Sequence, residues 1–267
     1  MVTHISKRVD VLVERHFINL AYLGAPFHGW QIQPNAVSVQ EVVEGALSTL
    51  FRTKIAIVGA GRTDAGVNAS MMIAHVDLPR RVDDCTAMVR ALNGILGPNI
   101  MVRWIRPVHA DAHARFDATA RTYRYYAHVG RDPFAGPLSW QAPEHLDFAA
   151  MNEAAKVLFE TEDFTSFSKL HTDVKTNICH VAKAEWTRID TSRHLLGAER
   201  WMFEITADRF LRNMVRAVVG TLVEVGRGKM DVNGFRDVIE RRNRCAAGTS
   251  MPGEPLFLHD VKYPYTI

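Results

Sequence analysis

The chain has 267 residues, of which 47% are hydrophobic and 23% charged, a composition typical of one large or two compact globular domains. No stretch approaches the roughly 20 consecutive apolar residues of a membrane span, and Met1–Arg15 lacks the apolar region of a secretory signal. The three cysteines form no C-x-x-C pair, which supports neither a zinc site nor a disulfide framework. We therefore expect a cytoplasmic protein without a structural metal. The net charge of +3 does not by itself indicate a nucleic-acid partner.

The first part of the chain is expected to alternate between strands and two amphipathic helices. Ser38–Glu41 (SVQE) has the spacing of a capping box, in which a serine hydroxyl and a glutamate carboxylate satisfy the first backbone amides of a helix. Helical spacing of apolar residues predicts helices over Val39–Phe51 and about Val82–Leu92. Runs rich in β-branched and apolar residues predict strands at Phe17–Leu23, Ile55–Val58, Met71–Leu78 and Ile100–Ile105.

A related series of elements follows. The predicted strands are Thr122–Val129, Ala182–Ile189, Trp201–Ala207 and Leu256–Tyr263, and the predicted helices are Phe148–Phe159, Arg209–Val225 and Asp231–Arg242. Because strands and helices do not alternate regularly, an α+β fold is favoured over a doubly wound parallel sheet. We predict two α/β-sandwich-like subdomains, residues 1–110 and 111–267, with largely antiparallel sheets flanked by helices and an active-site cleft between them.

The Gly-rich segment Gly59–Gly66 (GAGRTDAG) allows three interpretations. A dinucleotide-binding loop is disfavoured, because Asp64 would stand where the third glycine must face a pyrophosphate. A tight turn, with glycines supplying positive φ and Asp64 capping the next segment, is the ordinary structural interpretation. A loop that holds Asp64 as a catalytic carboxylate, with Arg62 as a nearby cation, is the third. The chemistry of the residues alone does not decide between the last two.

Basic residues are gathered in short groups along the chain. One group lies on the predicted helix Arg209–Val225, where apolar side chains form one stripe and a second face carries Arg209, Arg212, Asn213, Arg216 and Gly220. Such a charged stripe is usually a solvated surface. Further groups occur at Arg80–Arg81, Arg103–Arg106, Arg115–Arg124, Arg227–Lys229 and Arg241–Arg244. Together they suggest one positive face, suited to the phosphates of a nucleic acid.

Gly61–Ala69 (GRTDAGVNA) closely resembles the G-R-T-D-A-G-V-H-A/G signature of the tRNA pseudouridine synthase A family. Five further segments resemble motifs of that family in the same order, from about residue 17 to residue 264. They are Gly29–Gln31 (GWQ), Ser38–Glu41 (SVQE), His113–Tyr125 (HARFDATARTYRY), Asp163–Phe167 (DFTSF) and Asn213–Gly226 (NMVRAVVGTLVEVG). The chain departs from the signature at Asn68, where the family usually has histidine.

The resemblance implies an isomerase that converts uridine to pseudouridine at positions 38, 39 and 40 of the anticodon stem-loop of tRNA, without a cofactor or metal and as a homodimer. It implies that Asp64 is the nucleophile, that Arg216 forms an ion pair with it, and that Tyr123 lies against the target uracil for stacking and proton abstraction. Arg62 is implied to engage the RNA, and Arg121, Arg209 and Arg212 are expected to bind the substrate as well. The alternatives are a non-catalytic RNA-binding protein on the same scaffold and a nucleotide-binding enzyme that uses the Gly59–Gly66 loop.

Overall fold

The computed structural model describes residues 14–169, 176–190 and 198–267, so most of the segment searched for a secretory signal lies outside it. The first part of the chain contains β1 (Glu14–Tyr22), α1 (Val39–Phe51), β2 (Ile57–Gly59), β3 (Asn68–Leu78), α2 (Cys85–Ile95) and β4 (Ile100–Pro107). Helix α1 begins as its capping box predicts, because Ser38 Oγ accepts the amide of Glu41 and the Glu41 carboxylate accepts the amide of Ser38.

The second part begins with β5 (Ala120–Val129), β6 (Trp140–Ala142) and α3 (Phe148–Ala155), which continues as a 3₁₀ turn through Lys156–Phe159. It goes on with β7 (Val181–Ile189), β8 (Arg200–Ala207), α4 (Met214–Gly226), α5 (Val232–Glu240) and β9 (Leu256–Lys262). Short 3₁₀ turns occur at Thr165–Phe167 and Arg244–Ala246. None of the helices in the described ranges is long and apolar enough to cross a membrane.

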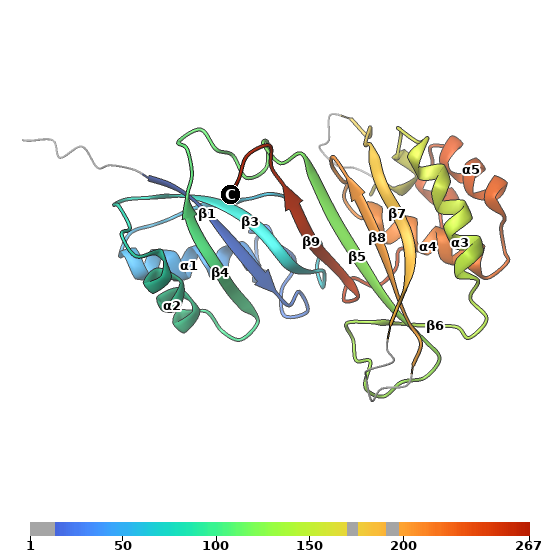
Figure 1. The fold of residues 1–267 in the computed structure, drawn as a ribbon, viewed down its shortest axis with the longest axis horizontal. Coiled ribbons are helices and arrows are strands. Elements are labelled where there is room, and N and C mark those ends of the chain that lie inside the picture. Colours follow the sequence, from blue (N-terminus) through green and yellow to red (C-terminus); the bar gives the residue numbers. More distant parts are fainter. Residues whose placement is uncertain (1–13, 170–175, 191–197) are drawn as a thin grey trace, which may run out of the picture.

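A single sheet joins the two parts of the chain, with the order β4-β1-β3-β9-β5-β8-β7 (Figure 1). Strand β2 also pairs with β3, and β6 with β5. Among the strand pairs of the described residues, only β3–β9 and β5–β6 are parallel, so the predicted α+β class with largely antiparallel strands is confirmed. Because the last strand, β9, lies between β3 and β5, the two predicted subdomains share one sheet.

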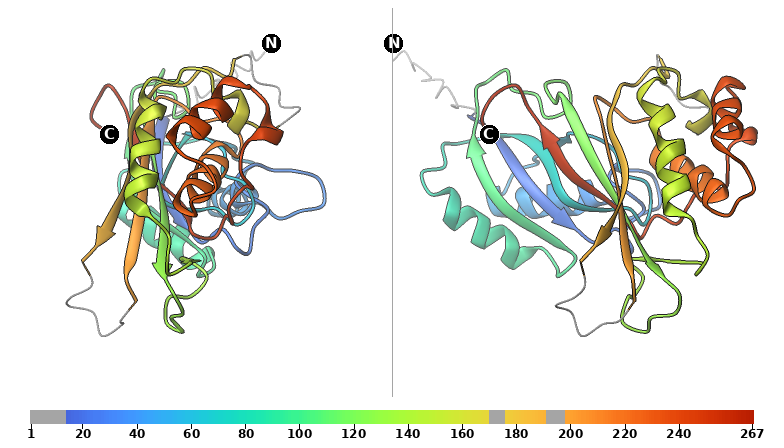
Figure 2. Two further views of the ribbon diagram at one scale, coloured as in Figure 1. Left: turned by 90° about the vertical axis from the view of Figure 1, so that its right-hand side faces the viewer. Right: turned by 45° about the vertical axis from the view of Figure 1, so that its right-hand side comes forward.

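The helices pack against this sheet in two groups, α1 and α2 beside the first strands and α3, α4 and α5 beside the last (Figure 1). The turned views place α1 and α4 on the same side of the sheet (Figure 2). The buried side chains form one continuous cluster, which includes Leu20, Val76, Tyr125 and Val218. The boundary between the two parts of the chain is therefore packed like the rest of the interior.

The predicted start of α4 at Arg209 is wrong. The helix begins at Met214, and Asn213 before it has a left-handed backbone (φ 67°). The carboxylate of Asp208 accepts the amides of His180 and Arg209 at 2.8 and 2.7 Å, which holds this region in a turn. Arg209 and Arg212 therefore lie on a loop before the helix and not on its face.

The interpretation of the second face of α4 as solvated is also wrong at Gly220. This residue is buried, and a Cβ atom there would lie 1.9 Å from the carbonyl oxygen of Thr249. Likewise α2 begins three residues later than expected, because the side chain of Asp84 accepts the amide of Ala87 at 2.8 Å and caps the helix there. These differences between prediction and structure arise from side-chain hydrogen bonds or packing contacts, which the spacing of apolar residues along a helix cannot predict.

Candidate active site

Asp64 lies on a tight turn between β2 and β3. Its carbonyl oxygen accepts the amide of Val67 at 3.1 Å, and Gly66 takes the positive φ (+79°) that this turn requires. The GWQ motif packs against the turn: the amide of Trp30 donates to the carbonyl of Thr63 at 3.1 Å, and a Cβ atom at Gly29 would lie 2.5 Å from that same oxygen. The spacing of the two motifs therefore reflects a backbone contact that only glycine permits.

Two other segments approach the turn closely. A Cβ atom at Gly24 would lie 2.2 Å from the carbonyl oxygen of Val67, and one at Gly253 would lie 2.8 Å from that of Ala65. The Asp64 turn is thus packed against main chain from the loop after β1 and from the segment before β9. This packing limits the positions that the carboxylate can reach.

Asn68, the departure from the family signature, is only 1% exposed and joins both of those segments. Its Oδ1 accepts the amide of Gly24 at 2.7 Å, and its Nδ2 donates to the carbonyl of Glu254 at 2.6 Å. The side-chain amide carries both an acceptor oxygen and a donor nitrogen, which is what this bridge requires. Asn68 therefore acts as a structural bridge immediately behind the Asp64 turn.

The ion pair of Asp64 is with Arg212. The Arg212 Nε lies 3.5 Å from Asp64 Oδ1, and the two side chains are 59% and 24% exposed. Arg216, the partner implied by the resemblance, donates from Nε to the carbonyl of Met251, whose amide donates to the carbonyl of Arg216 at 3.1 Å. An Arg216–Asp64 pair is not among the ion pairs of the described residues, and the role of Arg216 in the reaction stays a prediction.

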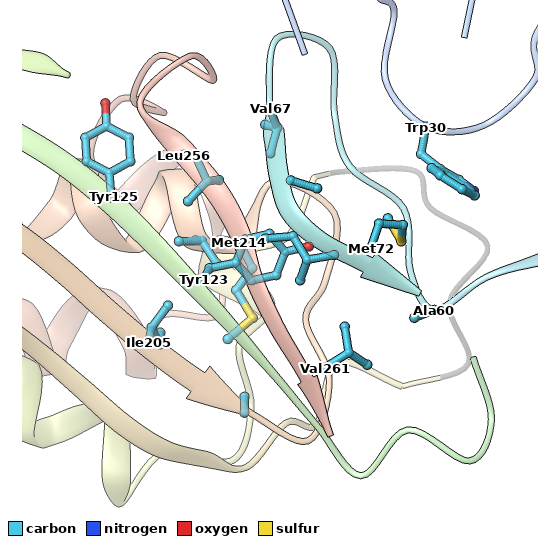
Figure 3. Close-up of a cluster of buried hydrophobic side chains, with 14 of the residues drawn as sticks. Trp30, Ala60, Val67, Met72, Tyr123, Tyr125, Ile205, Met214, Leu256 and Val261 are labelled. Carbon is cyan, nitrogen blue, oxygen red and sulfur yellow. The ribbon is translucent and has the colours of Figure 1, made fainter. Parts of the chain in front are cut away.

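One tyrosine is close enough to the Asp64 carboxylate to feel its charge, and a second is bonded to the neighbouring Thr63. Tyr123 on β5 is 9% exposed and lies in the buried cluster drawn in Figure 3. Its ring meets the ring of Phe210 edge-on at 5.0 Å. Burial, and then the negative charge of Asp64, raise the pKa of Tyr123. Tyr22 is hydrogen-bonded to Thr63 Oγ1 at 2.9 Å, and burial raises its pKa too. Both hydroxyls are therefore protonated at neutral pH.

Arg121 on β5 was expected to contact substrate. In the structure its guanidinium donates hydrogen bonds to four main-chain carbonyls. Nη1 donates to Ala118 and Asp208, each at 2.8 Å, and Nη2 donates to Ala60 at 2.9 Å and to Arg115 at 2.6 Å. Burial lowers the pKa of this guanidinium. Arg121 thus joins the start of the Asp64 loop to the segment before α4. Arg62 is exposed and Arg209 half-buried.

The segment 247–254 belongs to the site and was not identified from the sequence. It lies along α4, where the amide of Gly248 donates to Thr221 Oγ1 at 2.9 Å and Ser250 Oγ accepts from Asn213 Nδ2 at 2.6 Å. It then reaches the Asp64 turn at Gly253. Its two glycines were the available signal, but their contacts are visible only in the folded chain. No group of three or more His, Cys, Asp or Glu side chains in the described ranges is arranged to hold a metal ion.

Comparison with known proteins gives the family to which the chain belongs. A family model described as tRNA pseudouridine synthase matches residues 154–264, and relatives of the same class match nearly the whole chain, which together define the class of protein. The chain is 56% identical to tRNA pseudouridine synthase A of Parabacteroides distasonis, over 94% of this chain and 97% of that protein. It is also 56% identical to that of Bacteroides thetaiotaomicron (96% and 93%) and 35% identical to that of Colwellia psychrerythraea (94% of each). The chain therefore belongs to the tRNA pseudouridine synthase A family, whose members are isomerases.

Proposed function

We propose that this protein isomerises uridine to pseudouridine at positions 38, 39 and 40 of the anticodon stem-loop of tRNA. In this reaction the C1′–N1 bond breaks and a C1′–C5 bond forms. The hydrogen on C5 leaves as a proton and N1 takes up a proton, so the base and sugar keep their composition and no electrons are gained or lost. Its membership of the family and the names of its relatives support tRNA uridine as the substrate.

We assign the nucleophile to Asp64. The observation that carries this assignment is the packing of its turn against three main-chain segments, with the carboxylate left 24% exposed beside Arg212. A carboxylate can add to an electron-poor carbon and leave again, which an isomerisation requires. A cation close to the carboxylate favours its ionised form when a substrate base excludes water. Arg212 or Arg216 supplies that cation in the complex with RNA.

Tyr123 is assigned to stacking on the target uracil and to removal of the C5 proton. Base–aromatic stacking contributes about 1–3 kcal/mol, comparable with the few kcal/mol needed to extrude a base from its stack. Because its pKa is raised, the hydroxyl is protonated before the reaction. It therefore accepts the C5 proton only as it releases its own proton, and the proton that N1 takes up balances this transfer. Tyr123→Phe retains stacking and removes this transfer, so it separates the two roles.

The remaining proposals concern the way in which tRNA is held. Arg62, Arg209 and Arg212 would contact phosphates of the stem, and affinity would then decrease steeply with salt through counterion release. Exposure of Arg62 and Arg212 supports such contacts. We also propose that the protein works as a homodimer in the cytoplasm, with each tRNA bound across both subunits.

The direct test is release of tritium from tRNA that carries [5-³H]uridine. Wild-type protein should release tritium and form pseudouridine at positions 38, 39 or 40. Asp64→Asn should bind the same tRNA but release no tritium above background, because a neutral side-chain amide cannot replace the carboxylate as the nucleophile. Equal release by both proteins would refute the role of Asp64, and no release by wild-type protein would refute the proposed reaction.

A further inference from the structure

Phe116 is a large apolar side chain that the structure leaves 76% exposed. It lies in a turn, residues 112–117, before β5. The ring stacks on His113 at 4.3 Å with an interplanar angle of 26°, and the guanidinium of Arg115 lies 5.8 Å from the ring centroid. An aromatic ring beside a cation on the surface has the chemistry that stacks nucleic-acid bases.

The turn that carries Phe116 is held from within by side-chain hydrogen bonds. His113 Nδ1 accepts the amides of Arg115 at 3.2 Å and Phe116 at 3.1 Å. The carboxylate of Asp117 accepts the amide of His113 at 2.7 Å and the hydroxyl of Tyr265 at 2.6 Å. Hydrogen bonds of Asp117, chiefly to Tyr265, lower the pKa of its carboxyl group, which keeps this acceptor ionised at neutral pH.

Other elements hold the same turn from outside. His75 Nδ1 on β3 accepts the amide of Ala114 at 3.1 Å, and the Tyr263 hydroxyl donates to the Ala114 carbonyl at 2.6 Å. Arg15 on β1 donates to the carbonyl of Ala112 at 3.2 Å. Main-chain groups of the turn are thus bonded to β1, to β3 and to the C-terminal residues. A turn fixed in this way displays Phe116 in one position, and so little entropy would be lost when a ligand stacks on it.

Arg121 fixes the position of the turn that carries Phe116 relative to the candidate active site. Its Nη2 donates both to the carbonyl of Arg115, next to Phe116, and to the carbonyl of Ala60, at the start of the Asp64 loop. One nitrogen atom therefore joins the two loops. A ligand held by Phe116 would be in a constant position relative to Asp64.

We propose that Phe116 is a stacking site for an unpaired base of the tRNA, separate from the target uridine, with Arg115 on an adjacent phosphate. This proposal rests on the proposed function, which supplies tRNA as the ligand. The fixed link to the Asp64 loop and the neighbouring cation favour RNA over an apolar protein partner. By stacking one base, Phe116 would set the register in which the stem-loop presents its uridine to Asp64.

The test is the affinity for full-length tRNA, measured by filter binding in an Asp64→Asn background so that no turnover occurs. Phe116→Ala should raise the Kd about 5- to 150-fold, the loss expected for one base–aromatic stack, with an unchanged salt dependence. Phe116→Leu should bind as weakly as Phe116→Ala because it lacks a π-face. Phe116→Trp should bind as wild type does, and the fluorescence of the added tryptophan should be quenched by tRNA. Arg115→Gln should reduce the salt slope by about one phosphate contact.

Phe134 is the matched control, because it is another phenylalanine with a similar exposure of 71%. Phe134→Ala should leave the Kd unchanged, which would show that loss of an exposed aromatic ring does not by itself weaken binding. Wild-type affinity in Phe116→Ala or in Phe116→Leu would overturn the proposal. So would a change of subunit stoichiometry in Phe116→Ala, measured by light scattering, since it would identify a contact between copies of this chain. If wild-type protein released no tritium while Phe116→Ala weakened binding, the reaction would be refuted and the stacking site retained. If wild-type protein released tritium normally and Phe116→Ala bound tRNA as tightly as wild type, the stacking site would be refuted and the reaction retained.

Discussion

Asn68 is buried, and its side chain joins the amide of Gly24 to the carbonyl of Glu254, so loss of this bridge should destabilise the protein. Asn68→Leu keeps the volume and removes both polar groups, which leaves the amide of Gly24 and the carbonyl of Glu254 without partners. A buried unsatisfied group costs about 1–3 kcal/mol. Because Glu254 is half-buried, water can replace the lost partner of its carbonyl in part. Two unsatisfied groups would cost about 2–6 kcal/mol in full, so we expect the free energy of unfolding to fall by about 2–4 kcal/mol.

The same substitution should reduce catalysis beyond its effect on stability. Gly24 contacts the main chain of the Asp64 turn, and Glu254 adjoins Gly66. We expect kcat for tritium release to fall by at least tenfold at a temperature where the variant is folded, with the Kd for tRNA little changed. A displacement of about 1 Å at a reacting group is enough for a loss of that size or larger.

Asn68→Asp tests the two hydrogen bonds of Asn68 separately. It keeps an acceptor for Gly24 but turns an ionised oxygen toward the carbonyl of Glu254, so burial and repulsion should raise the pKa of the new carboxyl group. A group whose pKa is raised on folding stabilises the folded state below its unfolded pKa and loses that contribution as the pH rises through the folded pKa. The stability deficit relative to wild type should therefore be smaller at pH 5 than at pH 8.

Urea unfolding followed by tryptophan fluorescence measures these differences. Asn93 is the matched control, because its side chain donates to the carbonyl of Val102 and accepts the amide of Val102, both at 2.8 Å, away from the Asp64 turn. Asn93→Leu should destabilise the protein to a similar extent and leave kcat unchanged. A loss below about 0.5 kcal/mol in Asn68→Leu, the scatter of ordinary surface substitutions, would refute the bridge. An equal loss of kcat in Asn93→Leu would refute the link to catalysis.

Three further predictions follow from single contacts. Arg121→Met leaves four carbonyls without their donor and should lower the free energy of unfolding, measured in urea, by about 2–4 kcal/mol. Arg121→Lys should recover only part of this loss because lysine lacks the planar guanidinium. Full stability in Arg121→Met would be inconsistent with this role. The pKa of His75 is lowered from 6.5 to about 4 by burial and then by His113, so stability present above pH 6.5 should decline toward pH 4, by at most about 3 kcal/mol. His75→Gln should flatten this part of the pH profile, and an unaltered profile would contradict it. Arg212→Ala should change stability by less than about 1 kcal/mol, as for other exposed pairs, and comparison of its kcat/KM with that of Arg216→Ala would identify which arginine supports Asp64.

The sequence by itself determined the elements whose signals are local. The capping box at Ser38 predicted the first residue of α1, and runs of β-branched and apolar residues located most of the strands that form the sheet. The motif around Asp64, together with five further motifs in the same order along the chain, also indicated the family. Such features depend on residues a few positions apart, and so they can be read without knowledge of the fold.

Only the tertiary structure decided which side chains meet at the site. The pairing of Asp64 with Arg212, the four carbonyls bound by Arg121 and the bridge at Asn68 join segments that are far apart in the chain. Periodicity placed Arg212 on a helix face, whereas a left-handed residue at Asn213 ends the turn that carries it. The reason is physical. The direction of an arginine or an asparagine side chain is set by the acceptors within its reach, and those acceptors are brought together by the insertion of β9 between β3 and β5.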